Sequence, residues 1–224
     1  MLHKTITVSQ QKGGAGKTTI AAHLSIALAQ QGYHIAILDT DPQGSLDAWF
    51  CARQNTDNFR DLTPLTFSRM TDKWRIRREI ERLEESHDFL IIDCPPHAQE
   101  ESRIAVQKAD LVIIPMQPSP MDLWATSRIV ELTNIEEAST RILLNRVNRN
   151  SRLGRRFIEE LPRCRFDNYL GNRVSFPSAM ADGLSVTETS PYSVAAQEIW
   201  MITEEVEQFF GAIADTNNRS SELA

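Results

Sequence analysis

Short apolar runs alternate along the chain with longer segments of helical period, and this alternation constrains the possible folds most strongly. Several runs are almost continuously hydrophobic, as at residues 89–92, which is typical of strands buried on both faces of a sheet. Strands that alternate with helices indicate βαβ units. The sequence therefore predicts an α/β fold with a mostly parallel, twisted sheet and helices on both faces. The expected strands are Lys4–Gln10, His34–Asp39, Leu65–Ser68, Phe89–Asp93, Leu111–Pro115 and Arg141–Val147, and the expected helices are Thr18–Gln31, Lys73–Ser86, Asp122–Glu137, Arg152–Glu160 and Ser193–Phe210.

The length of 224 residues suits a single domain, which we place at residues 1–214, with a polar tail at 215–224 that is expected to be disordered. Hydrophobic residues make up 41% and charged residues 24%, close to the averages of soluble globular proteins. No apolar run approaches the roughly 18 residues of a membrane span, and the first residues lack a signal-peptide pattern. We therefore expect a cytoplasmic protein. The three cysteines form no Cys-x-x-Cys pair, which argues against a disulfide framework or a zinc site.

A glycine-rich turn at residues 11–16 stands between the first expected strand and the first expected helix. Its glycines allow consecutive backbone N–H groups to surround an anion, and the N-terminus of the helix adds positive potential. Lys17 contributes a full positive charge, and the hydroxyl of Thr18 is placed to bind Mg²⁺. A glycine turn that only joins a strand to a helix is the alternative. The motif predicts a P-loop NTPase-like fold and a nucleotide site made of Lys12, Gly13, Gly14, Ala15, Gly16, Lys17, Thr18 and Thr19.

The turn departs from the usual P-loop at two neighbouring positions. Gln11 occupies the place of the first glycine of the ordinary consensus, and a second lysine, Lys12, follows it. The resulting Lys-Gly-Gly-x-Gly-Lys-Thr string is the deviant Walker A motif, and with it the chain resembles the ParA/MinD family of ATPases. A lysine that is merely solvated in the loop is the alternative interpretation of Lys12.

Two carboxylate segments follow expected strands in the order found in that family. The segment 39–43 follows the second strand, where a carboxylate would face the ligand crevice of an α/β fold. The resemblance implies that Asp41 positions water for hydrolysis and that Asp39 lies near Mg²⁺. Asp93 ends an apolar strand in the Walker B pattern and is expected to hold Mg²⁺, partly through water or Thr18. Each aspartate could instead cap a helix or a turn.

The resemblance also implies a cycle with ATP and Mg²⁺. Two chains would form an ATP-dependent dimer in which Lys12 of each subunit reaches the nucleotide of the other, and Gly13 would lie where the chains approach. Asn145 matches the residue that contacts adenine. The implied catalytic residues are Lys12, Lys17 and Asp41. A ParB-type centromere-binding partner would stimulate an intrinsically weak hydrolysis.

Positive charge is concentrated in one part of an otherwise acidic chain. The net charge is −6, yet residues 141–173 contain nine arginines against three acids. Arginines can contact phosphate backbones without reading bases, so we expect non-specific DNA binding and association with the nucleoid. A solvated helix face, or packing and dimer contacts, is the alternative. The candidate DNA-binding residues are Arg149, Arg152, Arg155, Arg156 and Arg173.

Within the family, the sequence favours a short ParA-type plasmid or chromosome partition ATPase. The first expected strand begins near residue 4, which leaves no helix-turn-helix ahead of it. A related ATPase that positions a protein cargo is the main alternative. A MinD-type division regulator would need an amphipathic C-terminal helix, whereas residues 211–224 are polar, so no membrane partner is expected. An iron–sulfur reductase, a metabolic ligase and a tyrosine kinase are further alternatives, because they share the superfamily.

Overall fold

The computed structural model describes residues 3–56, 61–96, 100–160 and 164–221. Within them, six parallel strands form one sheet in the order β3-β2-β4-β1-β5-β6. Each expected strand is present, with ends that differ by up to three residues, and the α/β fold is confirmed. Among the described residues, no helix is long and apolar enough to cross a membrane. The strands are β1 (Lys4–Val8), β2 (Ile35–Asp39), β3 (Thr66–Arg69), β4 (Phe89–Asp93), β5 (Leu111–Met116) and β6 (Thr140–Leu144).

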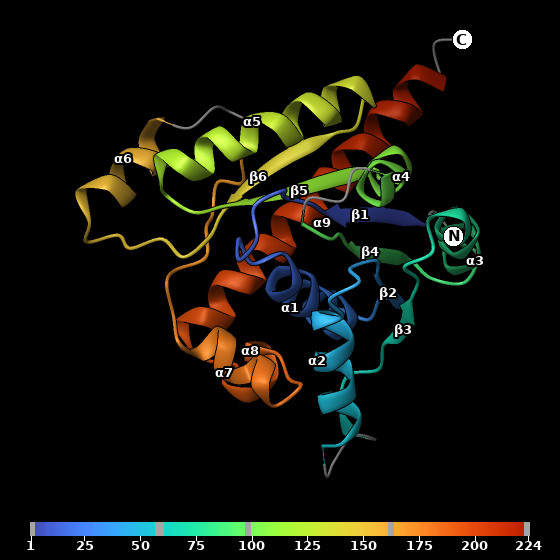
Figure 1. The fold of residues 1–224 in the computed structure, drawn as a ribbon, viewed down its shortest axis with the longest axis horizontal. Helices are drawn as coiled ribbons and strands as arrows, with labels where there is room; N and C mark the ends of the chain where they lie inside the picture. The colour runs from blue at the N-terminus through green and yellow to red at the C-terminus, as the bar shows by residue number, and fades with distance from the viewer. Residues whose placement is uncertain (1–2, 57–60, 97–99, 161–163, 222–224) are drawn as a thin grey trace.

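Helices cover both faces of the sheet (Figure 1). One face packs against α1 (Lys17–Gln30), α2 (Ser45–Gln54), α7 (Ser175–Ala181), α8 (Val186–Thr189) and α9 (Val194–Ser221). The other packs against α3 (Lys73–Glu84), α4 (Glu100–Lys108) and α5 (Pro120–Ile135), with α6 (Arg152–Glu160) beside α5. The sequence did not predict α2, α4, α7 and α8. Helix α9 continues to Ser221 and so enters the segment 215–224 for which the sequence favours a disordered tail.

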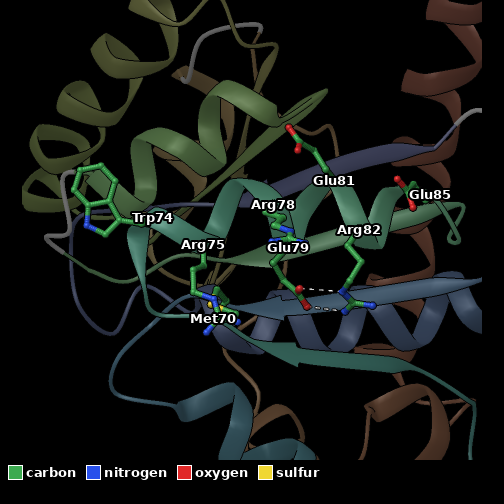
Figure 2. Close-up of a pocket in the computed structure, with 8 residues that line it drawn as sticks. All are labelled: Met70, Trp74, Arg75, Arg78, Glu79, Glu81, Arg82 and Glu85. Atoms are coloured by element: carbon green, nitrogen blue, oxygen red, sulfur yellow. Dashed lines mark hydrogen bonds and ion pairs between the residues drawn. The ribbon is translucent and has the colours of Figure 1, made fainter.

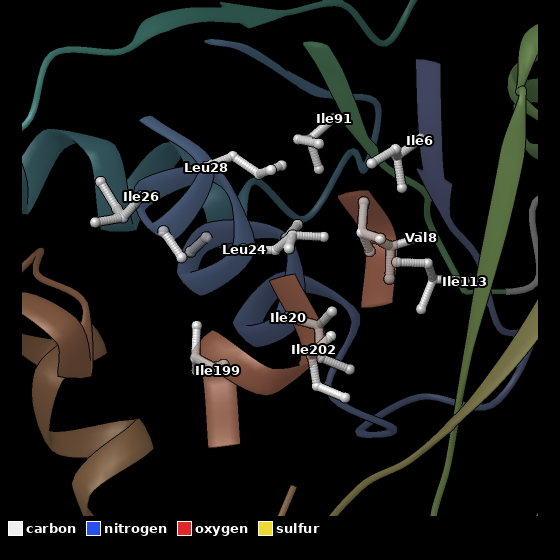
Figure 3. Close-up of a cluster of buried hydrophobic side chains, with 14 of the residues drawn as sticks. Ile6, Val8, Ile20, Leu24, Ile26, Leu28, Ile91, Ile113, Ile199 and Ile202 are labelled. Carbon is white, nitrogen blue, oxygen red and sulfur yellow. The ribbon is translucent and has the colours of Figure 1, made fainter. Parts of the chain in front are cut away.

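The hydrophobic strands divide their side chains strictly between the two faces. In β1, Ile6 and Val8 join the cluster around α1, while Thr7 points to the other face and donates to the carbonyl of Ala105 in α4 at 2.9 Å. Figure 3 shows Leu24 of α1 among the side chains of this cluster. Because α1 packs against the sheet and also against α2, α7, α8 and α9, it has little polar face of its own.

The parallel arrangement brings the carboxyl ends of the strands to one edge. The register pairs Val8 and Asp39 with Asp93, which lies on the central strand β4. The loop that follows β1 leads into α1, and Asn145 directly follows β6. Segments that are far apart in the sequence therefore meet above the same edge of the sheet.

A buried ion pair fixes the α7–α8 region to α2. The guanidinium of Arg53 is 1% exposed and binds both carboxylate oxygens of Glu188 at 2.7 and 2.9 Å. It also donates to the carbonyls of Thr63 at 2.8 Å and Gly183 at 3.2 Å, and it lies over the ring of Trp49. Both terminal nitrogens of this cation thus have partners, as a charge inside a core requires.

A fully buried histidine links α1 to the start of α8. Nδ1 of His23 lies 2.9 Å from the Ser185 hydroxyl and accepts from the Val186 N–H at 3.3 Å, so the ring is neutral with its proton on Nε2. Burial lowers the pKa of His23 to about 4. The unfolded chain, with an ordinary pKa near 6.5, takes up this proton first on acidification. The stability that depends on neutral His23 is complete above about pH 6.5 and is lost as the pH falls toward 4.

We therefore expect wild-type protein to lose roughly 1 to 2 kcal/mol through His23 between about pH 7 and pH 5. His23→Asn keeps an acceptor near the position of Nδ1 and cannot titrate in this range. Its unfolding free energy should be lower at pH 7, because the ring leaves a cavity, but should depend less on pH. Chemical unfolding of both proteins at the two pH values measures the difference. Parallel pH profiles would contradict this role of His23.

Candidate functional site

The glycine-rich loop takes the backbone conformation that an anion cradle requires. Gly14 and Gly16 have φ values of +74° and +101°, which side chains rarely permit. A Cβ atom on Gly16 would lie 2.2 Å from Nδ2 of Asn145, and the same Nδ2 donates to the carbonyl of Ala15 at 2.9 Å. The Asn145 side chain therefore fixes the glycine-rich loop through its contacts with Ala15 and Gly16. The sequence predicted a nucleotide contact for Asn145, and the structure adds this clamping role.

Lys17 and Thr18 begin α1 and face the end of β4. Lys17 is 7% exposed, and burial lowers the pKa of its ammonium, opposed by the nearby carboxylates of Asp93 and Asp41. The Thr18 hydroxyl donates to Oδ2 of Asp93 at 2.7 Å. The three motifs that the sequence placed together, at residues 11–19, 39–43 and 93, do meet in one site.

Asp93 has the properties of a cation ligand. Its Oδ1 is buried without a hydrogen-bond partner among the described residues. Burial raises the pKa of Asp93 to about 7, although the Thr18 hydrogen bond and Lys17 act in the opposite direction. A buried carboxyl with one unpaired oxygen gains most from a cation, so Asp93 and Thr18 fit Mg²⁺. In the described part of the chain, no group of three or more acidic, histidine or cysteine residues forms a cage, which fits a Mg²⁺ that keeps water and phosphate ligands.

Asp39 supports the loop that carries Asp41. Its two carboxylate oxygens accept from the backbone N–H groups of Asp41 at 2.9 Å and Asp47 at 3.1 Å. Burial raises the pKa of Asp39, and these two hydrogen bonds oppose the shift. Both oxygens of the Asp39 carboxylate thus already accept hydrogen bonds from the backbone. Its place near Mg²⁺ stays a prediction.

Asp41 lies beside the phosphate loop and does not cap α2. Its Oδ1 accepts from the N–H of Gln43 at 2.9 Å, while Gly44 stands at the helix N-cap. The loop is held from the other side by Arg69, which donates to the Pro42 carbonyl at 3.1 Å. Asp41 is 7% exposed, so its carboxylate is fixed at the rim of the site.

Lys12 makes a contact that the sequence analysis missed. Its ammonium lies 2.6 Å from Oδ2 of Asp122, which is 1% exposed and also accepts from the Ser119 hydroxyl. Oδ1 of Asp122 has no partner among the residues that the structure describes. Gln117, which directly follows β5, makes a second contact with the loop by donating to the Gly14 carbonyl at 3.0 Å. In this single chain, Lys12 is thus neutralised within its own subunit.

The arginines predicted to bind DNA do not share one environment. Arg152, Arg155 and Arg156 line a shallow groove of about 700 Å³ on α6. Arg149 lies over the ring of Tyr169, 5.8 Å from its centroid. Arg173 makes two hydrogen bonds to Glu198, at 2.7 and 2.9 Å, and so is held in an ion pair within the chain.

The arrangement suits the binding and cleavage of a phosphate chain. The N-terminus of α1, the loop N–H groups and Lys17 offer positive potential, and Asp93 with Thr18 offers oxygen ligands to a cation. Asp41 supplies a carboxylate for a water molecule.

Comparisons with known proteins agree with this site. Residues 4–157 match the model of a family described as ATPase MipZ. "Maintenance of carboxysome distribution protein A" of Halothiobacillus neapolitanus is 30% identical over 214 residues, covering 90% of this chain and 95% of the relative. The sporulation initiation inhibitor protein Soj of Bacillus subtilis is 24% identical and covers 91% of this chain and 98% of its own.

Solved structures show the same fold. The ATP complex of a Cyanothece McdA variant superposes with a TM-score of 0.72 at 18% identity, covering 94% of this chain and 97% of that chain. MinD of Pyrococcus horikoshii, complexed with Mg-ADP, gives a TM-score of 0.74 at 19% identity, covering 94% and 98%. With the deviant Walker A loop, the Walker B aspartate and these matches in hand, the chain belongs to the ParA/MinD family of deviant Walker A ATPases.

Proposed function

We propose that this protein is an ATP-driven positioning ATPase that distributes a protein assembly along DNA. The observation that carries the proposal is the 30% identity to a carboxysome distribution protein over nearly the full length of both chains. A ParA protein of Rhizobium radiobacter is 33% identical, but only over 59% of this chain. The comparisons thus favour the protein-cargo alternative over the plasmid partition that the sequence analysis preferred.

ATP and Mg²⁺ are the ligands that the site fits. Lys17 and the N–H groups of the loop would hold the phosphates, Thr18 and Asp93 would hold Mg²⁺, and Asn145 would contact the base while clamping the loop. Bound Mg²⁺ supplies charge neutralisation and polarises a phosphoryl oxygen. Asp41 orients the attacking water and accepts its proton. Hydrolysis should be slow until a partner protein completes the site.

ATP should convert the single chain into a dimer in which Lys12 leaves Asp122 for the nucleotide of the other subunit. Lys12→Ala alone would also leave the buried Asp122 carboxylate unpaired, which is strongly destabilising. We therefore expect the double variant Lys12→Ala/Asp122→Asn to fold and to remain monomeric with ATP. Light scattering after gel filtration measures the oligomeric state.

Two variants complete this test. Asp122→Asn alone frees Lys12 and should dimerise at least as readily as wild type. Gly13→Val should block dimerisation without disturbing the monomer, since nothing lies within 4 Å of a Cβ atom at Gly13. ATP-dependent dimers of both the double variant and Gly13→Val would refute the exchange of Lys12.

The dimer should be retained on DNA through α6. Charge reversal of Arg152, Arg155 and Arg156 together should remove most ATP-dependent DNA binding. It should lower the slope of log affinity against log salt by about 5, because the dimer carries two copies of these three arginines and each phosphate contact contributes roughly 0.9. Reversal of the exposed Arg75 and Arg78 on α3 is the matched control and should change neither. Equal affinity of the α6 variant and wild type across a salt titration would remove this role.

The cargo can be identified in the source cell. We expect fluorescently tagged protein to lie over the nucleoid and its deletion to collapse a protein assembly into one focus. Plasmid inheritance should be unchanged. Plasmid loss with normally spaced assemblies would instead support partition.

A further inference from the structure

Helix α3 presents a surface that the ATPase site does not use. It consists of Met70, Trp74, Arg75, Arg78, Glu79, Glu81, Arg82 and Glu85, which surround a groove of about 690 Å³ (Figure 2); we call it the α3 face. Only Ile76, Ile80 and Leu83 of this helix are buried. The helix therefore contributes three side chains to the core, contacts α4 along one side, and leaves the α3 face to solvent.

The charges along helix α3 oppose the helix dipole. Four cations stand in the first six residues of α3, at positions 73, 75, 77 and 78, and no acid stands in the first turn. The acids at 79, 81, 84 and 85 follow toward the C-terminus. Since the N-terminus of a helix carries partial positive charge, a helix arranged for its own stability would have the reverse order. The carboxylate of Asp72 caps the helix by accepting from the Trp74 N–H at 3.0 Å. One capping carboxylate does not balance four cations, so the observed order suits an additional, external anion beside the first turns of the helix.

The two cations at the start of the face, Arg75 and Arg78, form no direct pair, although the charge of Arg75 helps to lower the pKa of Glu79 after the larger effect of Arg82. The acids of the face are mostly paired. Arg75 and Arg78 make no side-chain hydrogen bond or ion pair with the described residues. Glu79 binds Arg82 at 2.6 Å, and Glu81 binds Lys108 at 2.9 Å, from α4. The charge left for a ligand is therefore positive at the N-terminal half of the groove.

An exposed tryptophan stands at the same end. Trp74 is 83% exposed, and Nζ of Lys73 lies 5.2 Å from its ring centroid. Figure 2 shows its ring at one end of the face, projecting away from the helix. Large exposed aromatic side chains next to arginines are the residues that most often anchor protein interfaces.

We propose that the α3 face docks a short segment of a partner protein in which acidic residues flank a large apolar side chain. The acids would meet Arg75 and Arg78, and the apolar side chain would pack against Trp74. A DNA backbone fits less well, because its phosphates recur about every 1.7 Å along the duplex. They would therefore also run over the acidic C-terminal half of the helix.

The position of the face connects it to the ATPase site. Met70, which lines the groove, donates its N–H to the carbonyl of Asp39 at 2.9 Å. Its neighbour Arg69 pairs with Asp47 at 3.0 Å and binds the Pro42 carbonyl, in the loop that carries Asp41. A segment docked on the α3 face would thus sit one residue from the side chain that supports this loop.

The test uses the full chain and a panel of fluorescein-labelled peptides that contain acidic residues around one aromatic side chain. Anisotropy titrations should show binding by wild type that Arg75→Glu/Arg78→Glu weakens at least about tenfold, and that Trp74→Ala also weakens. Arg77→Glu is the matched control, since Arg77 points to α4 and donates to Gln107 at 3.2 Å; it should bind like wild type. Unfolding temperatures verify that the variants are folded.

A second panel with the acids replaced by lysine separates docking from a merely structural effect. These basic peptides should bind the Arg75→Glu/Arg78→Glu variant better than wild type. The proposal is overturned if no acidic peptide binds wild type more tightly than the double variant. It is also overturned if that variant loses affinity for a duplex DNA fragment, because the surface would then bind nucleic acid.

Discussion

Replacement of Asp41 by alanine is expected to slow ATP hydrolysis about 10²- to 10⁴-fold, the usual effect of removing a positioned general base. ATP binding and dimerisation should persist, because the phosphate contacts come from the loop and Lys17. Asp41→Asn should lose as much activity, although its side chain can still accept from the Gln43 N–H, the contact that Asp41 makes at 2.9 Å. Phosphate release and nucleotide binding, measured on the same samples, separate the two effects.

Asp47→Ala is the matched control. Asp47 lies in the same region and pairs with Arg69, but both side chains are at least one-third exposed and the pair should contribute little. Its hydrolysis rate should stay within a few-fold of wild type. If Asp41→Asn hydrolyses ATP at the wild-type rate, the carboxylate of Asp41 is not the catalytic group.

Replacement of Arg53 by methionine is expected to destabilise the protein by about 3 to 5 kcal/mol. The guanidinium is 1% and the Glu188 carboxylate 9% exposed, so the substitution leaves a buried charge without its partner. For a chain of this size, the unfolding temperature should fall by roughly 6 to 20 °C. Differential scanning calorimetry measures this change directly.

A second variant identifies the cause of the loss. Arg53→Met/Glu188→Leu removes both charges and should recover much of the stability, as uncharged replacements of buried pairs often do. Arg82→Met breaks a pair of similar length with Glu79, but Arg82 is 57% exposed, so its cost should be below about 1 kcal/mol. Equal losses for Arg53→Met and Arg82→Met would show that burial does not govern the energetics of this pair.

The strands and the phosphate loop were predictable because their signals are local. A parallel sheet buried on both faces requires continuous apolar runs, and those at β2, β4 and β5 can be read directly from the sequence. Even β3, whose burial is only partial, was expected within one residue. Asp39 and Asp93 were expected at the same edge of the sheet, because parallel strands have their carboxyl ends at one edge, and the register pairs them there.

The helices that the sequence did not reveal are short or bury small side chains. Helix α4 buries Ser102, Ala105 and Val106, which give a weak apolar stripe. Helices α7 and α8 have only seven and four residues. Helix α2 buries Leu46, Trp49 and Arg53 at helical spacing, so its signal was present but included a charged residue. Because arginine usually lies at the surface, Arg53 hides the buried stripe of α2 in the sequence. Its pairing with Glu188 is what allows this residue to be buried.

The contact between Lys12 and Asp122 could not be read from the sequence for a different reason. The two residues are 110 positions apart, and nothing local marks Asp122 as buried. Ser119 and Pro120 are typical of the first residues of a helix. The helix was expected to begin at Asp122, two residues later than observed. Only the assembled sheet brings the end of β5 beside the phosphate loop.

The contrast between α1 and α3 bears on how such proteins diverge. Ten of the 14 positions of α1 are buried against the sheet or other helices, whereas α3 buries three of 12. Random substitution should therefore be purged along almost the whole of α1 and accepted over most of α3. Relatives can therefore keep the same phosphate-binding site while the sequence of α3 changes. A new binding partner can be acquired in this way without a change in the ATPase site.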